Sequence, residues 1–205
     1  VFSRFGLGNS YDQNWTGRYN LYSVNLQTIS AVPTLAWKIN DMFSVSAGLE
    51  IMNVNLTTEQ KAPGFNLKGT TPVPGMDHDA EVQASGWGVG GHFGLHARLN
   101  DQWSVGLAYK TQVTVNAYGD AKFDGPYAGK LQKVTNSDAH GTVQLPDSLA
   151  LGVAYKPLDN LSFEVGAVWT RWSTYNSLNI YMDNGNQSIS HKNWQDGWNF
   201  NASVE

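Results

Sequence analysis

The sequence predicts an all-β protein, an antiparallel up-and-down transmembrane β-barrel. Side chains alternate between two faces along a strand, and residues 103–116 follow this period of two. One face is mostly apolar and consists of Trp103, Val105, Leu107, Tyr109, Thr111, Val113 and Val115. The other face is polar or small and consists of Ser104, Gly106, Ala108, Lys110, Gln112, Thr114 and Asn116. Similar stretches recur along the chain at lengths that suit a bilayer crossing.

Short and long connections alternate between the expected strands. Short turns are predicted at 39–42, 100–102 and 157–160, and long polar loops at 57–79, 119–141 and 183–192. The strands are predicted at 24–38, 43–56, 80–99, 103–116, then one ending at 156, one over 161–182 and one from 194 onward. Residues 1–20 show no sustained period. Small turns on one side of the membrane and large loops on the other are typical of a barrel. A β-sandwich would need at least one connection that breaks this alternation of short and long connections.

Charges in the strand cores fall on the polar face. They are Lys38, Glu50, Arg98, Lys110, Lys156, Glu164 and Glu205. A Lys or Arg on the lipid face in mid-bilayer costs roughly 2–4 kcal/mol, so lipid would impose this segregation. Four charges break the rule near strand ends on the long-loop side: Glu81, Asp147, Arg171 and Asp196. The pattern therefore favours apolar side chains facing lipid and polar side chains lining an interior.

Aromatic residues cluster by depth on the predicted lipid face. Trp37, Phe43, Trp103, Tyr155 and Phe163 lie near the short turns. Trp169 and Tyr175 are expected toward the other end, which gives two girdles.

Glycine and proline mark special places in the predicted strands. Pro33 removes one ladder donor and predicts a bulge or local opening in the first strand. Gly86, Gly88, Gly90 and Gly94 share the inner face, where missing side chains leave room for a ligand, a plug or a bend.

Composition excludes several classes of protein. The 205 residues carry a net charge of −4, whereas nucleic-acid binding normally needs a basic surface, so no nucleic-acid partner is expected. The absence of cysteine excludes disulfides and thiol chemistry. No run of about 18 apolar residues predicts a transmembrane helix. No signal peptide is visible and residues 200–205 still alternate, so we expect an internal piece of a longer protein.

Candidate chemical sites are weak. His92 and His96 would lie about 13 Å apart along a strand, too far to share a metal, and are expected to be polar lining of the interior. The Asp77-His78-Asp79 segment could touch a divalent ion but is expected to be a solvated loop. No catalytic signature is present, so no enzyme, metal site or cofactor is predicted.

Six segments form an ordered series along the chain: FGLGNSYDQNWTGRY (5–19), PTLAWKIND (33–41), GWGVG (86–90), GLAYK (106–110), LPDSL (145–149) and WTRWSTY (169–175). In this order they resemble the FadL family of outer-membrane long-chain fatty acid transporters. The resemblance implies a bacterial outer-membrane location and a 14-stranded barrel plugged by an N-terminal hatch. Residues 1–205 would then form a partial barrel, with the hatch and the remaining strands outside this chain.

The resemblance also implies passive uptake of long-chain fatty acids or other hydrophobic compounds. Burying a 16-carbon tail could contribute about 10 kcal/mol, at about 0.8 kcal/mol per CH₂. A carboxylate needs a basic partner, and the family's two basic positions resemble Arg18, in its Gly-Arg-Tyr context, and the 190–194 loop with Lys192. Gln195 stands where the family's lysine is expected, so a neutral hydrophobic cargo remains open. Outer-membrane lipid and lipopolysaccharide are the other expected partners.

Two other functions remain as alternatives. A general aqueous porin would need charge rings around an open pore, whereas this predicted interior is rich in glycine and carries few charges. An outer-membrane lipase or protease would need a clustered catalytic set at the rim of the barrel.

Overall fold

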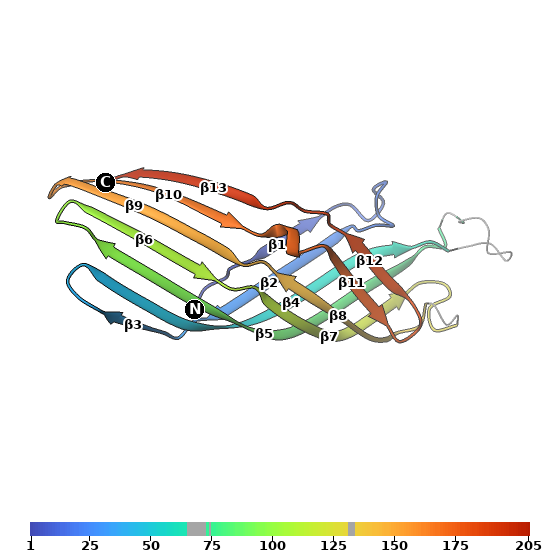
Figure 1. Ribbon diagram of the computed structural model, residues 1–205. Coiled ribbons are helices and arrows are strands. Elements are labelled where there is room, and N and C mark those ends of the chain that lie inside the picture. The colour runs from blue at the N-terminus through green and yellow to red at the C-terminus, as the bar shows by residue number, and fades with distance from the viewer. Residues whose placement is uncertain (65–72, 74, 131–133) are drawn as a thin grey trace.

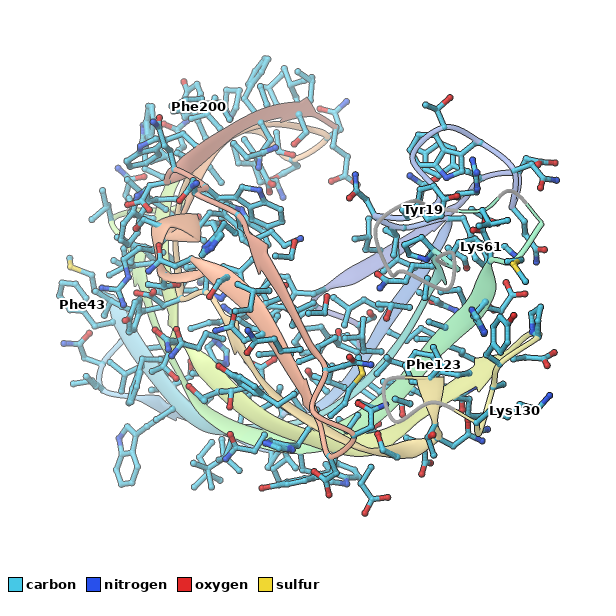
Figure 2. All side chains as sticks on the ribbon, turned by 90° about the vertical axis from the view of Figure 1, so that its right-hand side faces the viewer. Tyr19, Phe43, Lys61, Phe123, Lys130 and Phe200 are labelled. Carbon is cyan, nitrogen blue, oxygen red and sulfur yellow. The ribbon has the colours of Figure 1, made fainter. Side chains whose placement is uncertain are left out.

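The computed structural model describes residues 1–64, 73, 75–130 and 134–205, and they form one antiparallel sheet. The predicted all-β class is confirmed: the described residues contain 13 strands and one short 3₁₀ helix, Trp172–Thr174. The sheet curls into an open trough, and its two long edges do not meet (Figure 2). None of the described residues forms a helix long and apolar enough to cross a membrane.

The strands form two tiers along the axis of the trough. Their bounds are β1 Gly6–Ser10, β2 Ser23–Ala31, β3 Thr34–Lys38, β4 Phe43–Ala62, β5 His78–Arg98, β6 Trp103–Lys110, β7 Val113–Asp124, β8 Ser137–Leu145, β9 Ser148–Leu158, β10 Leu161–Thr170, β11 Ser177–Met182, β12 Gln187–His191 and β13 Gly197–Val204. The lower tier is the part of the wall at the end with the short turns, on the left in Figure 1, and has the order β3-β4-β5-β6-β9-β10-β13. The upper tier, at the end with the long connections, has the order β1-β2-β4-β5-β7-β8-β11-β12 (Figure 1).

Only β4 and β5 run uninterrupted through both tiers. Four of the other predicted strands are each divided in two, as β2/β3, β6/β7, β8/β9 and β10/β11. The strand predicted from 194 onward is β13, and β12 precedes it within the predicted loop over 183–192. Pro33 lies in the first of these interruptions, as the missing ladder donor predicts.

The long connections are shorter than predicted. β4 extends to Ala62 and β7 to Asp124, beyond the predicted strand ends. The prediction of a loop over 183–192 is wrong, because β12 occupies Gln187–His191. Many exposed side chains of the upper tier are polar, among them Asn116, His140 and Gln187, so parts of these strands have the composition of loops. Parts of the loops predicted at 57–79 and 119–141 lie outside the described residues.

The wall contains a one-residue insertion where β6 passes into β7. The ladder between β5 and β6 ends with the pair His92–Lys110, and the ladder between β5 and β7 begins with the pair Trp87–Asn116. Residues 111–115 therefore oppose residues 88–91, five residues against four. Such an insertion turns the side chains that follow it to the opposite face of the sheet.

The insertion corrects one part of the predicted facing. Val113 and Val115 are fully buried inside the trough at 0 % exposure, whereas Thr114 and Asn116 are exposed on its outer side. The prediction that the two valines share the lipid-facing side with Trp103 is therefore wrong. Strict alternation continues through residues 111–112 in the sequence, so it gives no sign of the change of face.

The polarity of the wall is reversed between the tiers. In the lower tier the outer face carries the apolar side chains, among them Leu35, Trp37, Leu151, Val165 and Phe200. Three predicted girdle residues stack on this face near the short turns, Trp103 on Tyr155 and Tyr155 on Phe163. In the upper tier the apolar side chains face inward and form a buried cluster of Met52, Val54, Val113, Val115, Val143 and Leu145.

Glycines on β5 make room for this inner cluster. A Cβ atom on Gly88 would lie 2.6 Å from Val113 Cγ1 and 2.7 Å from Val115 Cγ2, and one on Gly90 would lie 2.8 Å from Val113 Cγ2. The predicted space on the inner face is thus occupied by side chains of β7 at these two positions, because the insertion turns the valines inward.

Candidate functional site

Four of the five interruptions in the strands lie on adjacent strands, and the fifth, at 32–33, is separated from them by β4 and β5. The five comprise residues 32–33, 111–112, 146–147, 171–176 and 192–196, between the two tiers. Strand ladders do not satisfy the backbone groups of such segments, so other partners must, especially within the depth of a membrane.

The side chain of Arg4 supplies partners for several of these segments. Its guanidinium donates to Glu50 Oε2 at 3.0 Å, to the carbonyl oxygens of Thr111 at 3.3 Å and Pro146 at 2.8 Å, and to Ser148 Oγ at 3.3 Å. Arg4 itself lies where the N-terminal segment changes register against β2, between the bridge Phe2–Ser30 and the pair Gly6–Gln27.

Glu50 receives a second hydrogen bond, from Ser30 Oγ at 2.9 Å. The side chains of Arg4 and Glu50 are 6 % and 1 % exposed. The positive charge of Arg4 is therefore neutralised inside the wall, and the guanidinium is bound on several sides by its own chain.

A second ion pair joins two of the charges that the sequence pattern left unexplained. Arg171 Nε donates to Asp147 Oδ1 at 2.8 Å, and Tyr109 Oη donates to Asp147 Oδ2 at 3.0 Å. Asp147 is buried, and the backbone N–H of Arg171 donates to its carbonyl oxygen at 3.1 Å. Asp196 accepts from the backbone N–H of Ser173 at 3.1 Å. These charges hold interrupted segments together.

An apolar cavity of about 800 Å³ lies on the inner face above Arg4. It is lined by Arg4, Phe5, Gly6, Leu7, Leu26, Val143, Leu145, Trp172, Tyr175, Lys192, Asn193, Trp194 and Gln195. Its members come from the N-terminal segment, from β1, β2 and β8, and from the interruptions 171–176 and 192–196.

Four aromatic rings form a continuous group in this cavity. Phe5 meets Trp172 edge to face with ring centroids 5.7 Å apart, Trp172 meets Trp194 at 5.1 Å, and Trp194 meets Tyr175 at 5.2 Å. Tyr175 also packs against the buried cluster of the upper tier, so the prediction that it belongs to an outer girdle is wrong. The irregular backbone at 171–176 lets the ring turn inward.

Lys192, the residue to which the family resemblance points, lines the cavity, and Gln195 belongs to the same lining. The backbone N–H of Lys192 donates to Asn176 O at 2.8 Å, which ties the 192–196 interruption to the 171–176 interruption. No ion pair of Lys192 with another described residue is found. A ligand contact by Lys192 stays a prediction.

Arg18 lies apart from this cavity, in the turn between β1 and β2. Its Nε donates to Asp77 Oδ2 at 3.4 Å, its Nη2 donates to Tyr19 Oη at 2.8 Å, and its guanidinium lies 4.4 Å from the centre of the Tyr19 ring. The structure does not bring Arg18 and Lys192 into one site, and the Arg18 side chain remains 27 % exposed. A ligand contact by Arg18 stays a prediction.

The Asp77-His78-Asp79 segment is occupied by contacts within the chain. Besides the contact of Asp77 with Arg18, Asp79 pairs with Lys61 Nζ at 2.6 Å. Asp79 also accepts from Tyr22 Oη at 3.1 Å, and burial together with this carboxylate raises the pKa of Tyr22. His78 is buried, and its Nε2 accepts from the backbone N–H of Tyr127 at 3.0 Å.

The inner face of the lower tier forms a second cavity of about 670 Å³. Small residues of neighbouring strands line it together with His92, His96 and Glu164. Glu164 thus faces the interior, as the charge pattern predicts.

Sequence reasoning missed Arg4 and the aromatic side chains Trp172 and Trp194. Arg4 lies in a segment without periodicity. Trp172 and Trp194 fall within the strands predicted over 161–182 and from 194 onward, but the structure has both in interruptions, where alternation carries no information about facing. A charge within the aromatic segment 1–5 was the one available signal for Arg4.

Comparison with known proteins agrees with this architecture. A family model described as "Outer membrane protein transport protein (OMPP1/FadL/TodX)" matches residues 1–205. The 47 kDa outer membrane protein of Pasteurella multocida is 25% identical over 122 residues, which are 55% of this chain and 28% of that protein.

Solved structures share the fold at low sequence identity. The Pseudomonas aeruginosa FadL homologue has a TM-score of 0.88 at 18% identity, and the match covers 98% of this chain and 51% of the homologue's chain. The Ralstonia pickettii toluene transporter TbuX has a TM-score of 0.76 at 19% identity, and the match covers 99% of this chain and 59% of the TbuX chain. The chain thus spans between half and three fifths of these two solved structures. The match over all 205 residues shows that this chain belongs to the outer-membrane transport protein family of FadL and TodX.

Proposed function

We propose that the protein mediates passive uptake of hydrophobic compounds across the outer membrane, with long-chain fatty acids as the leading cargo. The observation that carries this proposal is the apolar cavity of about 800 Å³ with its group of four aromatic rings. Apolar surface transferred from water to such a cavity supplies about 0.8 kcal/mol per CH₂ group, so capture needs no energy source.

Lys192 supports the choice of a carboxylate-bearing cargo. A carboxylate cannot leave water for an apolar cavity without a compensating partner. Arg4 is already bound to Glu50, Thr111 and Pro146, so the available cation of the lining is Lys192. Arg18 is held by Asp77 and Tyr19 and is proposed as a weaker, outer contact.

A neutral aromatic hydrocarbon is the second candidate cargo. Gln195 in the lining offers no charge, and the aromatic rings of Phe5, Trp172, Tyr175 and Trp194 suit an aromatic guest. The similar TbuX structure is that of a toluene transporter. The two candidates differ in their dependence on Lys192, since a neutral guest gains nothing from an ammonium group.

A general aqueous porin is less compatible with the interior. In the described part of the chain, Met52, Val54, Val113 and Val115 fill the inner side of the upper tier at 0 % exposure. The buried ion pair of Arg4 and Glu50 lies between this apolar filling and the cavity of the lower tier. An aqueous pore needs a continuous wetted path instead.

Uptake of radiolabelled oleate and of toluene by cells that produce the full-length protein, but lack their own transporters, tests the proposal. We expect uptake above that of empty cells and a several-fold loss in Trp194→Ala. The matched control is Trp198→Ala, whose ring is exposed on the outer face of β13. Uptake that is unchanged in Trp194→Ala, or a steady ion conductance by the reconstituted protein, would contradict it.

A further inference from the structure

The outer surface of the upper tier carries a small cavity that the uptake of hydrophobic compounds does not use. It has a volume of about 310 Å³ and is lined by Asn116, Tyr118, His140, Gly141, Thr142, Asn179 and Tyr181. These residues belong to β7, β8 and β11, which lie side by side in the wall (Figure 1).

The first feature of this surface is a row of aromatic side chains. Tyr118 on β7 is the direct neighbour of His140 on β8, and His140 is the direct neighbour of Tyr181 on β11. The rings of His140 and Tyr181 are stacked with centroids 5.7 Å apart. Tyr118 and Tyr181 are 66 % and 42 % exposed, so their ring faces are open to a ligand.

The second feature is a parallel row of amides and a hydroxyl. Asn116, Thr142 and Asn179 are direct neighbours on the same three strands, two residues along from the aromatic row. Thr142 Oγ1 donates to Asn116 Oδ1 at 2.9 Å. Asn179 Oδ1 has no hydrogen-bond partner among the described residues, so turning this amide toward a ligand breaks no bond of its oxygen.

Aromatic rings beside amide groups suit a saccharide. The C–H face of a sugar ring packs on an aromatic face, and its hydroxyls need groups that donate and accept, as amides and hydroxyls do. No Lys, Arg, Asp or Glu is among the described residues that line the cavity. Asp120 and Asp138 face each other on the next row of β7 and β8, which disfavours phosphate groups there. The surface therefore suits neutral sugar residues.

The position of this surface indicates the source of the sugar. On the neighbouring strand β5, the outward apolar side chains continue from the short turns as far as Val89 and Trp87, which are 63 % and 68 % exposed, and Trp87 is the direct neighbour of Asn116. The amide row is therefore level with Trp87, whose ring suits the membrane interface, and the aromatic row lies two residues, about 7 Å, farther along the strands at about 3.3 Å per residue. The surface thus faces sideways beyond the hydrocarbon, where the outer leaflet of an outer membrane presents the saccharides of lipopolysaccharide.

We propose that Tyr118, His140 and Tyr181, with Asn116, Thr142 and Asn179, form an outward-facing site for neutral sugar residues of lipopolysaccharide. The site would bind the barrel to the glycolipids that surround it above the lipid tails. It is separate from the inner cavity, since its residues lie on the opposite face of the sheet.

Binding of lipid-free core oligosaccharide to the full-length protein in detergent tests this site. The affinity is compared with those of Tyr118→Ala/Tyr181→Ala, of the milder Asn179→Ala, and of the control Tyr11→Ala, whose exposed ring lies in the turn after β1. Maltoheptaose, a free glucan, is the second probe. Retention of the folded band on unheated gels shows which variants keep the barrel.

We expect the wild-type protein and Tyr11→Ala to bind the core oligosaccharide equally, with little dependence on salt because the site carries no charge. Affinity should fall at least about tenfold in the double variant and measurably in Asn179→Ala. Equal binding by all variants, loss of wild-type binding at high salt, or preference for maltoheptaose would each overturn the proposal. Oleate uptake is measured in parallel and should not change in these variants, so failure of this site is distinguishable from failure of the proposed transport.

Discussion

Arg4 and Glu50 form a buried ion pair with Nη1 and Oε2 3.0 Å apart, at the level where the wall passes from one tier to the other. The same guanidinium binds the carbonyl oxygens of Thr111 and Pro146, so one side chain links the N-terminal segment, β4 and two interruptions. Strands that are interrupted at the depth of a membrane need such hydrogen-bond partners, because lipid offers none to the unpaired backbone groups.

Replacing Glu50 by Ala should destabilise the barrel strongly. The substitution leaves the Arg4 guanidinium buried without its counter-ion, and breaking a buried pair from one side costs about 3–5 kcal/mol. The midpoint of thermal unfolding of the full-length protein, followed by circular dichroism or by the gel shift of the folded band, measures the change.

Two variants make this test specific. Arg4→Met/Glu50→Met should recover part of the loss, since no uncompensated charge remains. Lys38→Ala, which removes the exposed pair with Asp41, should leave the midpoint nearly unchanged. A Glu50→Ala protein as stable as wild type would show that the pair contributes little.

The inner glycines give a second prediction. Gly88→Ala places a methyl group 2.6 Å from Val113 Cγ1 and should destabilise by about 1–3 kcal/mol. Gly106→Ala meets nothing within 4 Å and should be nearly neutral. Adding Val113→Ala to Gly88→Ala should restore part of the stability in the same unfolding assay. Equal effects of the two glycine substitutions would contradict the packing described for β7.

The change of face between β6 and β7 can be tested by chemical labelling. The 205 residues contain no cysteine, so single cysteines can be placed at will. A membrane-impermeant maleimide applied to intact cells should label cysteines at Thr114 and Asn116 rapidly, and cysteines at Val113 and Val115 slowly. Labelling of 113 and 115 in preference to 114 and 116 would mean that no residue is inserted at 111–112.

The lower tier was predictable because one rule governs it. Lipid demands apolar outer side chains, so alternation gives both the strands and their facing, as at Trp103, Leu107 and Phe163. In β12 the inward residues are Ser188 and Ser190, in register with Ile180 and Leu178, so the strand has no apolar face and had the composition of a loop. Single-residue insertions leave alternation intact, which is why Val113 and Val115 were placed on the wrong face.

The candidate cavity was only partly predictable, for a related reason. The family resemblance led to Lys192 as a candidate ligand contact, which stays a prediction. Arg4, Trp172 and Trp194 of the same lining were not predicted, and they lie in irregular segments. Their positions follow from where distant interruptions meet in the folded wall, and this juxtaposition leaves no local pattern in the sequence.

The nature of the cargo gives a fourth prediction. Lys192→Ala should weaken oleate binding to the full-length protein several-fold, because a charge-assisted hydrogen bond is lost, and should leave toluene binding unchanged. Arg18→Ala should have a smaller effect on oleate, since Asp77 and Tyr19 already hold that side chain. Isothermal titration with each ligand measures both. Equal oleate affinity in Lys192→Ala and wild type would favour a neutral cargo.

The most direct measurement is photo-crosslinking of a fatty acid with a diazirine near its methyl end to the full-length protein, with the sites mapped by mass spectrometry. The account predicts crosslinks in the inner cavity, at residues such as Phe5, Leu26, Val143 and Trp194. Crosslinks confined to outward side chains such as Leu151 and Val165 would instead show the ligand dissolved in the surrounding lipid, and would contradict the assignment of this cavity as the binding site.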